Sequence, residues 1–162
     1  MDPQAIIDNF RRNITEHYFD MTGRVRRQEF WYFVIACIVV GLVAAILDSI
    51  IHTGLLTAVV RLGLILPLAG LGARRLQDTG KDGKLVWIWV ALAAINSVMA
   101  LLLALMGPMG ALGFLFFFFS IGWLLGLAEL VIAIVLIYLW AQPGTVGSNQ
   151  YGPDPKGGLA TA

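Results

Sequence analysis

The sequence predicts an all-α membrane protein, a four-helix transmembrane bundle with a short N-terminal amphipathic helix. Of the 162 residues, 59% are hydrophobic and 13% are charged, and the mean hydropathy is +0.81. Soluble domains carry about a quarter charged residues, so the polar surface of this chain would not cover a water-soluble globule. Four apolar runs are long enough to cross a bilayer, and every Lys and Arg except Arg61 lies outside them. These observations place the chain in lipid.

Residues 1–22 carry the pattern of a short amphipathic helix. Asp2 suits the N-cap, and Pro3 suits the first helical position, where a missing N–H removes no hydrogen bond. Apolar side chains then recur at four-residue spacing and form one face: Ile6, Phe10, Ile14 and Tyr18. Two interpretations of this face stay open. It either anchors to anionic lipid or docks a partner at the membrane surface, or it packs on the bundle of its own chain.

The four-span transmembrane domain is expected over residues 23–141. Its spans are predicted near residues 30–47, 54–73, 85–106 and 109–138. Each crosses a hydrocarbon core of about 30 Å at ~1.5 Å per residue, the first only if its helix begins among the preceding polar residues. The fourth run, at roughly 45 Å, is longer than that thickness. It is therefore expected to tilt, to kink near Gly113, or to begin as an interfacial piece through residues 114–119.

Loop charge predicts the orientation of the chain. Lys and Arg precede the first span, recur in the loop 74–84 between the second and third spans, and follow the fourth span in the Pro/Gly-rich tail 142–162. The two connections on the other side, 48–53 and 107–108, contain neither residue type. The positive-inside rule then puts both termini and the loop 74–84 in the cytoplasm.

Arg61 and Glu129 are the charged side chains that lie well inside the apolar runs. An isolated ionised group there costs several kcal/mol. Counted from the predicted cytoplasmic ends of their helices, Arg61, Asn96 and Glu129 lie at depths of about 19, 18 and 16 Å, in one layer. We hypothesise that Arg61 and Glu129 form a buried or water-lined ion pair with Asn96 nearby. The pair either fixes helix register and neutralises two charges, or lines a proton or ion path.

The sequence contains no recognised catalytic, metal or cofactor motif. A Walker phosphate loop, an HExxH sequence, a paired CxxC and a GxSxG elbow are absent. The single Cys37 excludes an intramolecular disulfide, and His17 and His52 lie on opposite predicted sides of the membrane. We therefore expect no catalytic residue, no metal and no cofactor. Acidic residues interleave with the basic clusters, which favours lipid headgroups over nucleic acid as partners.

Three motifs occur in order at the predicted cytoplasmic ends of the spans. They are Gly23-Arg24-x-x-Arg27-x-Glu29-Phe30-Trp31, Arg74-Arg75-Leu76-x-Asp78-x-Gly80, and Pro143-Gly144-x-x-Gly147-x-Asn149-x-Tyr151-Gly152-Pro153-Asp154-Pro155. Over residues 18–155 the chain resembles the domain-of-unknown-function family of small bacterial inner-membrane proteins of the YhaH type. The resemblance implies a location in the bacterial plasma membrane and carries no activity with it. Where the family tends to have histidine before the aspartate, this chain has Gln77.

The three motifs are expected to share one cytoplasmic face. Its candidate residues are Arg24, Arg27, Glu29, Trp31, Arg74, Arg75, Asp78, Gly80, Asn149, Tyr151 and Asp154. The guanidinium and carboxylate groups are expected to satisfy one another, with Arg74 and Asp78 at helical i,i+4 spacing. Three alternatives stay open for this face: a paired structural cap, a surface that recognises a cytoplasmic protein or anionic lipid, and a catalytic or small-molecule site.

Three classes of function follow from these features. The first is an interaction or regulatory membrane module that presents the Arg/Asp-rich face to a cytoplasmic or membrane protein. The second is a small transporter or channel subunit that uses the layer of Arg61, Asn96 and Glu129, which four spans would enclose only as a homo-oligomer. The third is an enzyme or binder acting on anionic lipid. A structured cytoplasmic face requires only the motifs that are present, so we rank the first class highest.

Overall fold

The computed structural model describes residues 3–157, and it is helical over most of that range. The chain begins with α1 (Pro3–Thr15) and continues with α2 (Arg27–Ile51) and α3 (Leu55–Asp78). A single 3₁₀ turn, Gly83–Leu85, leads into α4 (Val86–Leu105). After it come α5 (Pro108–Phe117), a π-helical stretch (Phe118–Gly122) and α6 (Trp123–Ala141). Within residues 3–157 there is no β-strand, which confirms the predicted all-α class.

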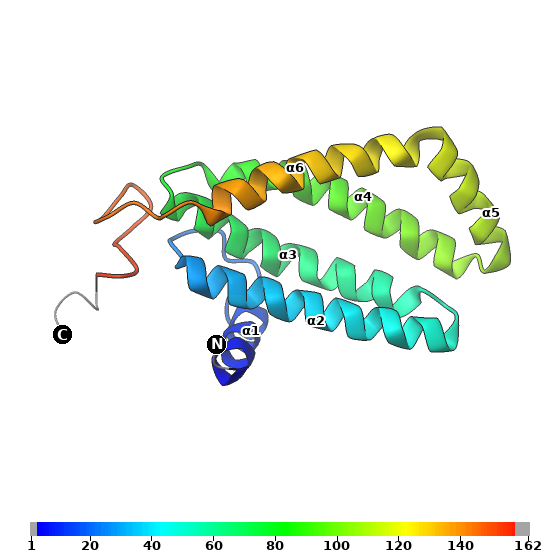
Figure 1. The fold of residues 1–162 in the computed structure, drawn as a ribbon, viewed down its shortest axis with the longest axis horizontal. Coiled ribbons are helices and arrows are strands. Elements are labelled where there is room, and N and C mark those ends of the chain that lie inside the picture. The colour runs from blue at the N-terminus through cyan, green and yellow to red at the C-terminus, as the bar shows by residue number, and fades with distance from the viewer. Residues whose placement is uncertain (1–2, 158–162) are drawn as a thin grey trace.

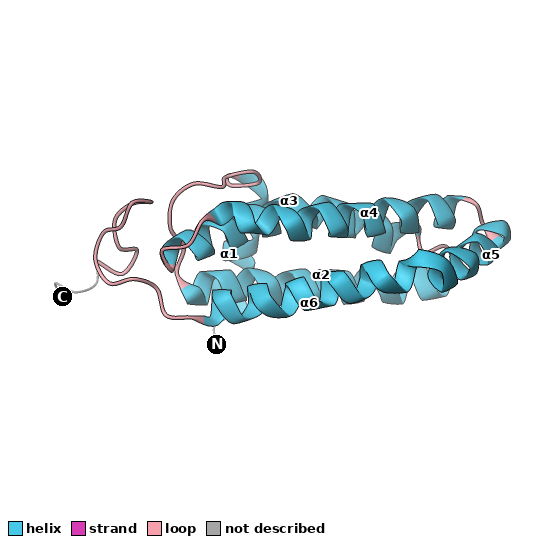
Figure 2. Ribbon diagram, turned by 90° about the horizontal axis from the view of Figure 1, so that it is seen from above, coloured by secondary structure: helices cyan, strands magenta, loops and turns pink. Residues whose placement is uncertain are grey.

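Four of the described helical segments are long and apolar enough to cross a membrane: Arg27–Ile51, Leu55–Asp78, Gly83–Leu105 and Pro108–Ala141. This confirms the predicted four-span bundle. The helix α3 packs against both α2 and α4, and α6 packs chiefly against α4. Figure 2 shows α3 and α4 in one layer and α2 and α6 in the other. Because α6 has its main contact with α4, the two helices of the second layer diverge toward α5 (Figure 1).

The helix α1 lies crosswise to the bundle and packs on α2, with a smaller contact to α3 (Figure 1). Phe10 stacks on Phe33 of α2 with ring centroids 5.5 Å apart, and Ile14 packs against the core beside it. The polar side chains of Asn9 and Asn13 are buried on the same side of the helix. The inner face of α1 therefore packs on its own bundle, whereas Ile7 near the start of the helix stays exposed.

The helix α1 ends at Thr15, which is earlier than the predicted end of the amphipathic segment at residue 22. Tyr18 leaves the helical path, and its hydroxyl donates a hydrogen bond to the carbonyl of Gly63 on α3 over 2.7 Å. The backbone of Asp20 lies against Gly70, where a Cβ atom would stand 2.8 Å from the Asp20 carbonyl oxygen. Tertiary contacts along α3 therefore replace the predicted helical continuation from residue 16 to residue 22.

The buried core lies toward the end of the bundle at which α3 and α6 end. Every residue of α3 from Ala69 to Asp78 is buried, together with Phe30, Phe33 and Trp140. The Trp140 indole N–H donates to the Gly72 carbonyl over 2.9 Å, and its ring packs on Phe30 at 4.8 Å. The other end of the bundle exposes large apolar side chains on α2, α4, α5 and α6. Such faces are stable when lipid covers them.

The fourth apolar run is broken by a bend, for which the sequence left three alternatives: a tilt, a kink near Gly113, or an interfacial piece through residues 114–119. The bend does not lie near Gly113. It lies at the π-helical stretch Phe118–Gly122, where the wider turn redirects the backbone between α5 and α6 (Figure 1). Gly122 stands at the end of this stretch, and a Cβ atom there would lie 2.8 Å from the Phe117 ring. Glycine thus permits the close packing of the bend.

We predict that Gly72→Ala lowers the free energy of unfolding by about 1–3 kcal/mol, because the added Cβ would lie 2.7 Å from Trp140 Cζ2 in a closely packed core. Gly63→Ala on the same helix is the matched control, since no atom stands within 4 Å of its added Cβ. Unfolding by SDS titration in mixed micelles, followed by far-UV circular dichroism, measures both variants. An equal effect of the two substitutions would contradict this account of the core.

Candidate functional site

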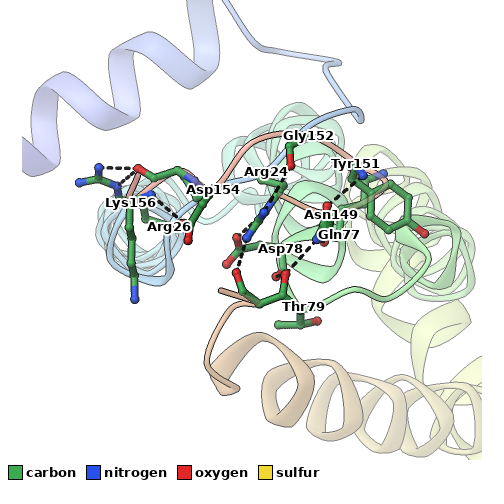
Figure 3. Close-up of polar contacts among 12 residues, drawn as sticks. Arg24, Arg26, Gln77, Asp78, Thr79, Asn149, Tyr151, Gly152, Asp154 and Lys156 are labelled. Carbon is green, nitrogen blue, oxygen red and sulfur yellow. Dashed lines mark hydrogen bonds and ion pairs between the residues drawn. The ribbon is translucent and has the colours of Figure 1, made fainter. Parts of the chain in front are cut away.

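The three sequence motifs meet at the end of the bundle where the core lies. We call this region the polar cap and define it as residues 22–31, residues 74–80 and residues 143–155 (Figure 3). Its centre is the carboxylate of Asp78, in the last turn of α3. Arg24 Nε lies 3.0 Å from Asp78 Oδ1, and Arg75 Nη1 forms an ion pair with Asp78 Oδ2. The exposed fractions of the three side chains are 2% for Arg24, 6% for Asp78 and 1% for Arg75.

Arg24 connects this carboxylate to the tail. Its guanidinium donates from Nη2 to the Thr145 carbonyl over 2.6 Å and from Nη1 to the Gly147 carbonyl over 2.6 Å. A third hydrogen bond, of 3.3 Å, reaches the Gly152 carbonyl (Figure 3). The guanidinium is therefore enclosed by acceptors from α3 and from the tail, which is the condition for a buried charge to be tolerated.

The tail also caps the C-terminal end of α3. The amide and the hydroxyl of Thr145 donate to the Asp78 carbonyl over 2.8 and 3.1 Å, and the Asn149 side-chain amide donates to the Gln77 carbonyl over 2.9 Å. These are carbonyls that a helix end leaves without an intrahelical partner. At Gly144 the fit is so close that a Cβ atom would stand 2.1 Å from Asp78 Oδ2. Glycine is therefore required at this position by packing.

Arg75 joins the end of α6 to the same centre. Its Nε donates to the Trp140 carbonyl over 2.9 Å, and its Nη2 donates to the Gln142 carbonyl. Arg27 adds a hydrogen bond of 3.4 Å to the Ala141 carbonyl. One carboxylate and its arginines therefore hold together the start of α2, the end of α3 and the end of α6.

The tail is stabilised by its own polar residues as well. Asn149 Oδ1 accepts from the Tyr151 amide at 2.9 Å, and Asp154 accepts from the Gly147 and Lys156 amides at 3.0 and 2.9 Å. The backbone N–H groups of Lys156 and Gly147, in that order, hold the pKa of Asp154 below its ordinary value of 3.8. The Arg26 guanidinium donates to the Pro155 carbonyl and fixes the far end of the tail.

The i,i+4 spacing of Arg74 and Asp78 had predicted that these two side chains pair, but they do not. Arg24 and Arg75 occupy both oxygens of that carboxylate, and the Arg74 side chain turns instead toward α1. Its Nη2 donates to Asn13 Oδ1 over 3.0 Å, and its Nη1 lies 3.9 Å from Asp20 Oδ2. The prediction used local spacing alone, and contacts distant in sequence decide the partner.

The remaining candidate residues of the face lie at the margin of the cap. Glu29 accepts from the Arg26 amide at 3.4 Å and lies 3.6 Å from Arg12 of α1, so it joins α2 to α1. The Trp31 ring packs edge-on against Phe30 at 5.3 Å and contributes apolar contact. Gly80 has a φ of +77°, as expected for the left-handed residue that follows α3. The helix itself runs through Asp78, so Arg74 and Arg75 are helical rather than part of a loop.

Sequence reasoning missed two residues of this region. Thr145 occupies an unspecified position of the third motif, and Asn13 was not among the candidate residues. Asn9 and Asn13 stand four residues apart on the buried side of α1, and the Asn13 amide donates to both oxygens of Asn9 at 2.9 and 3.1 Å. Two asparagines at helical spacing next to Phe10 were the feature of the sequence that could have indicated a buried polar contact on this side of α1.

A second candidate site lies between the spans. Arg61, Asn96 and Glu129 line one cavity of about 300 Å³ to which α2, α3, α4 and α6 all contribute. The Asn96 amide donates to Glu129 Oε2 over 2.5 Å. Among residues 3–157 no ion pair within 4.0 Å joins Arg61 to Glu129, so the two side chains do not pair directly here, and the water-lined form of the pair stays a prediction. Glu129 meets Asn96 because α6 packs chiefly on α4 rather than on α3.

No group of three or more His, Cys, Asp or Glu side chains suited to a metal ion occurs within the described part of the chain.

Comparison with known proteins finds relatives along almost the whole chain. A family model described as "Protein of unknown function (DUF805)" matches residues 18–153. The chain is 30% identical over 148 residues to Inner membrane protein YhaI of Escherichia coli K12, covering 90% of this chain and 94% of that protein. It is 28% identical over 149 residues to Inner membrane protein YhaH of the same strain, covering 88% and 93%. No solved structure matches the chain.

We predict that Asp78→Asn lowers the free energy of unfolding by about 3–5 kcal/mol, because it leaves the buried guanidinium groups of Arg24 and Arg75 without their counter-charge. Gly144→Ala is expected to destabilise the cap by steric conflict without removing a charge. Glu16→Gln, an exposed acidic position, is the control and should change stability little. The same micellar unfolding experiment measures all three. Wild-type stability of Asp78→Asn would show that the ion pairs do not hold the cap together.

Proposed function

This chain belongs to the family of proteins of unknown function DUF805, and we propose that it serves as an interaction or regulatory module of the bacterial inner membrane. The observation that supports the proposal most directly is the direction in which the charged side chains of the polar cap point. Arg24, Arg75 and Asp78 point inward and bind one another and the tail, so they do not themselves form a recognition surface. What they do is hold one exposed turn of the tail in a fixed conformation.

That turn is centred on Val146, a residue that is 97% exposed. Arg24 binds the carbonyls of the residues on either side of it, Thr145 and Gly147. A turn that is already ordered loses little conformational entropy when a partner binds, which favours affinity. We therefore propose that Val146 and the exposed Ser148, two residues further along the tail, contact a protein partner in the cytoplasm or in the membrane, and that the Arg/Asp network presents them.

The proposed location of the partner follows from charge. The two ends of the bundle differ in charge, since six exposed cationic side chains lie in or next to the segments of the polar cap: Arg11, Arg12, Arg27, Lys81, Lys84 and Lys156. The turns at the opposite end contain neither Lys nor Arg. By the positive-inside rule we propose that the polar cap and both termini lie in the cytoplasm, with the cationic side chains close to anionic headgroups.

A transporter or channel subunit is the second candidate, and the cavity of about 300 Å³ favours it. The cavity brings together one guanidinium, one carboxamide and one carboxylate from three different helices. If it is part of a proton path, Glu129→Gln should abolish proton flux into proteoliposomes that carry a pH-sensitive dye, whereas Ser120→Ala on an exposed position should not. Equal flux in protein-free liposomes and in wild-type proteoliposomes would exclude this function.

We predict that a photo-crosslinking residue placed at Val146 gives a discrete adduct in native membranes. Arg24→Gln should reduce that adduct strongly while the chain stays in the membrane, because the turn loses two of its anchoring hydrogen bonds. The same probe at exposed Met109, at the opposite end of the bundle, is the control. Mass spectrometry identifies the partner, and an adduct of twice the chain's 17.6 kDa identifies a second copy. No adduct at Val146, or the same adduct from both positions, would contradict the proposal.

We predict that the polar cap is protected from impermeant reagents added outside the cell. In a Cys37→Ala background, Ser148→Cys should react with an impermeant maleimide only after the inner membrane is permeabilised, and Met106→Cys should react in intact spheroplasts. The opposite labelling pattern would reverse the proposed orientation.

A further inference from the structure

A small polar cavity lies between α1, the segment that follows it, and α3. Its volume is about 160 Å³. Six polar side chains line it: Arg12, Asn13, His17, Arg24, Glu29 and Arg74. The cavity is separate from the larger one between the spans, with which it shares no lining residue.

Arg74 is incompletely satisfied in this cavity. Its side chain is 9% exposed, and within residues 3–157 its buried Nε atom has no hydrogen-bond partner. Its Nη2 donates to Asn13 Oδ1, and its Nη1 is 3.9 Å from Asp20, which is too long for a hydrogen bond. A buried donor on a charged group that lacks an acceptor is costly. Because Nε itself is buried, an acceptor in the cavity that Arg74 lines would reach the side chain at Nη1.

The carboxylate nearest to Arg74 is shared with other groups. Asp20 also lies 3.3 Å from His17 Nδ1, and it accepts from the Thr22 amide at 3.2 Å. Arg12 lies opposite, 3.6 Å from Glu29, and its side chain is about half exposed. Arg24 binds Asp78 and the tail. Two guanidinium groups, those of Arg74 and Arg12, therefore have donor capacity left on the walls of one cavity.

We propose that this cavity binds a phosphate-type anion, which accepts from Arg74 Nη1 and from the Arg12 guanidinium. A compact tetrahedral group has acceptor oxygens in several directions, which suits donors on different walls. A phosphomonoester that keeps one proton also has a donor for the Glu29 carboxylate, which would repel an anion without one. The ligand is either a free phosphate compound or the headgroup of a phosphomonoester lipid. A lipid headgroup is one of the two sources because α1 lies crosswise to the spans, as a helix at the membrane surface does. The site does not depend on the proposed interaction function.

The test uses the full chain in nanodiscs made of phosphatidylcholine alone, with inorganic phosphate as the probe and chloride at equal ionic strength as the reference. Phosphate should raise the melting temperature of the wild type. Arg12→Gln, which changes a half-exposed residue, should weaken phosphate binding by about 10-fold or more, the effect of losing a charge-assisted hydrogen bond. Arg11→Gln, the next residue on α1 and outside this cavity, is the matched control and should bind phosphate like the wild type.

A second arm distinguishes the sources of the anion. Nanodiscs that contain phosphatidic acid replace those of phosphatidylcholine, and native mass spectrometry counts the retained lipid. Retention of phosphatidic acid that is lost in Arg12→Gln and not in Arg11→Gln assigns the site to a lipid headgroup, whereas a response to inorganic phosphate without retained lipid assigns it to a free anion. Binding of neither probe, or equal loss in both variants, would overturn the proposal.

Discussion

The buried carboxylate of Asp78 is the constraint on which the polar cap depends. It has an arginine on each side, one from the segment before α2 and one from α3 itself. Neither arginine would be stable at this burial without the carboxylate, and the carboxylate would not be stable without them. Since both guanidinium groups also bind backbone carbonyls, the same charges determine where the tail and the end of α6 lie.

The two ends of the bundle are built on different principles. At the polar cap, aromatic packing and buried hydrogen bonds hold the helices close, with Trp140 between Gly72 and Phe30. Toward α5 the helices diverge, their apolar faces are exposed, and the cavity with Arg61 and Glu129 lies between them. A rigid cap on a more loosely packed set of spans suits a protein that presents a fixed surface from the membrane. A transport function, the second candidate, would depend on this cavity.

The sequence contained enough to predict the spans and the position of the cap, because both depend on local composition. The apolar runs predict the four spans, although α3 continues to Asp78, past the predicted end of the second span at residue 73. The sequence did not contain the partner of Arg74. Asp78 is the i,i+4 neighbour of Arg74, but its carboxylate binds Arg24, which lies 54 residues from Asp78 in sequence. Depth along the helices grouped Arg61, Asn96 and Glu129 correctly around one cavity. Depth could not show which helices are neighbours. Glu129 contacts Asn96 because α6 packs on α4, and no local pattern in the sequence predicts that packing.

The most direct test of this account is amide hydrogen exchange of the tail in nanodiscs. The Thr145 amide donates to Asp78, the Gly147 amide to Asp154, and the Asn149 amide to Gly152. If the buried ion pairs order the tail, these three amides should exchange far more slowly than those of an unstructured peptide, and Asp78→Asn should remove the protection. Exchange at the unstructured rate in the wild type would contradict the central claim that the Asp78 network fixes the tail to the bundle.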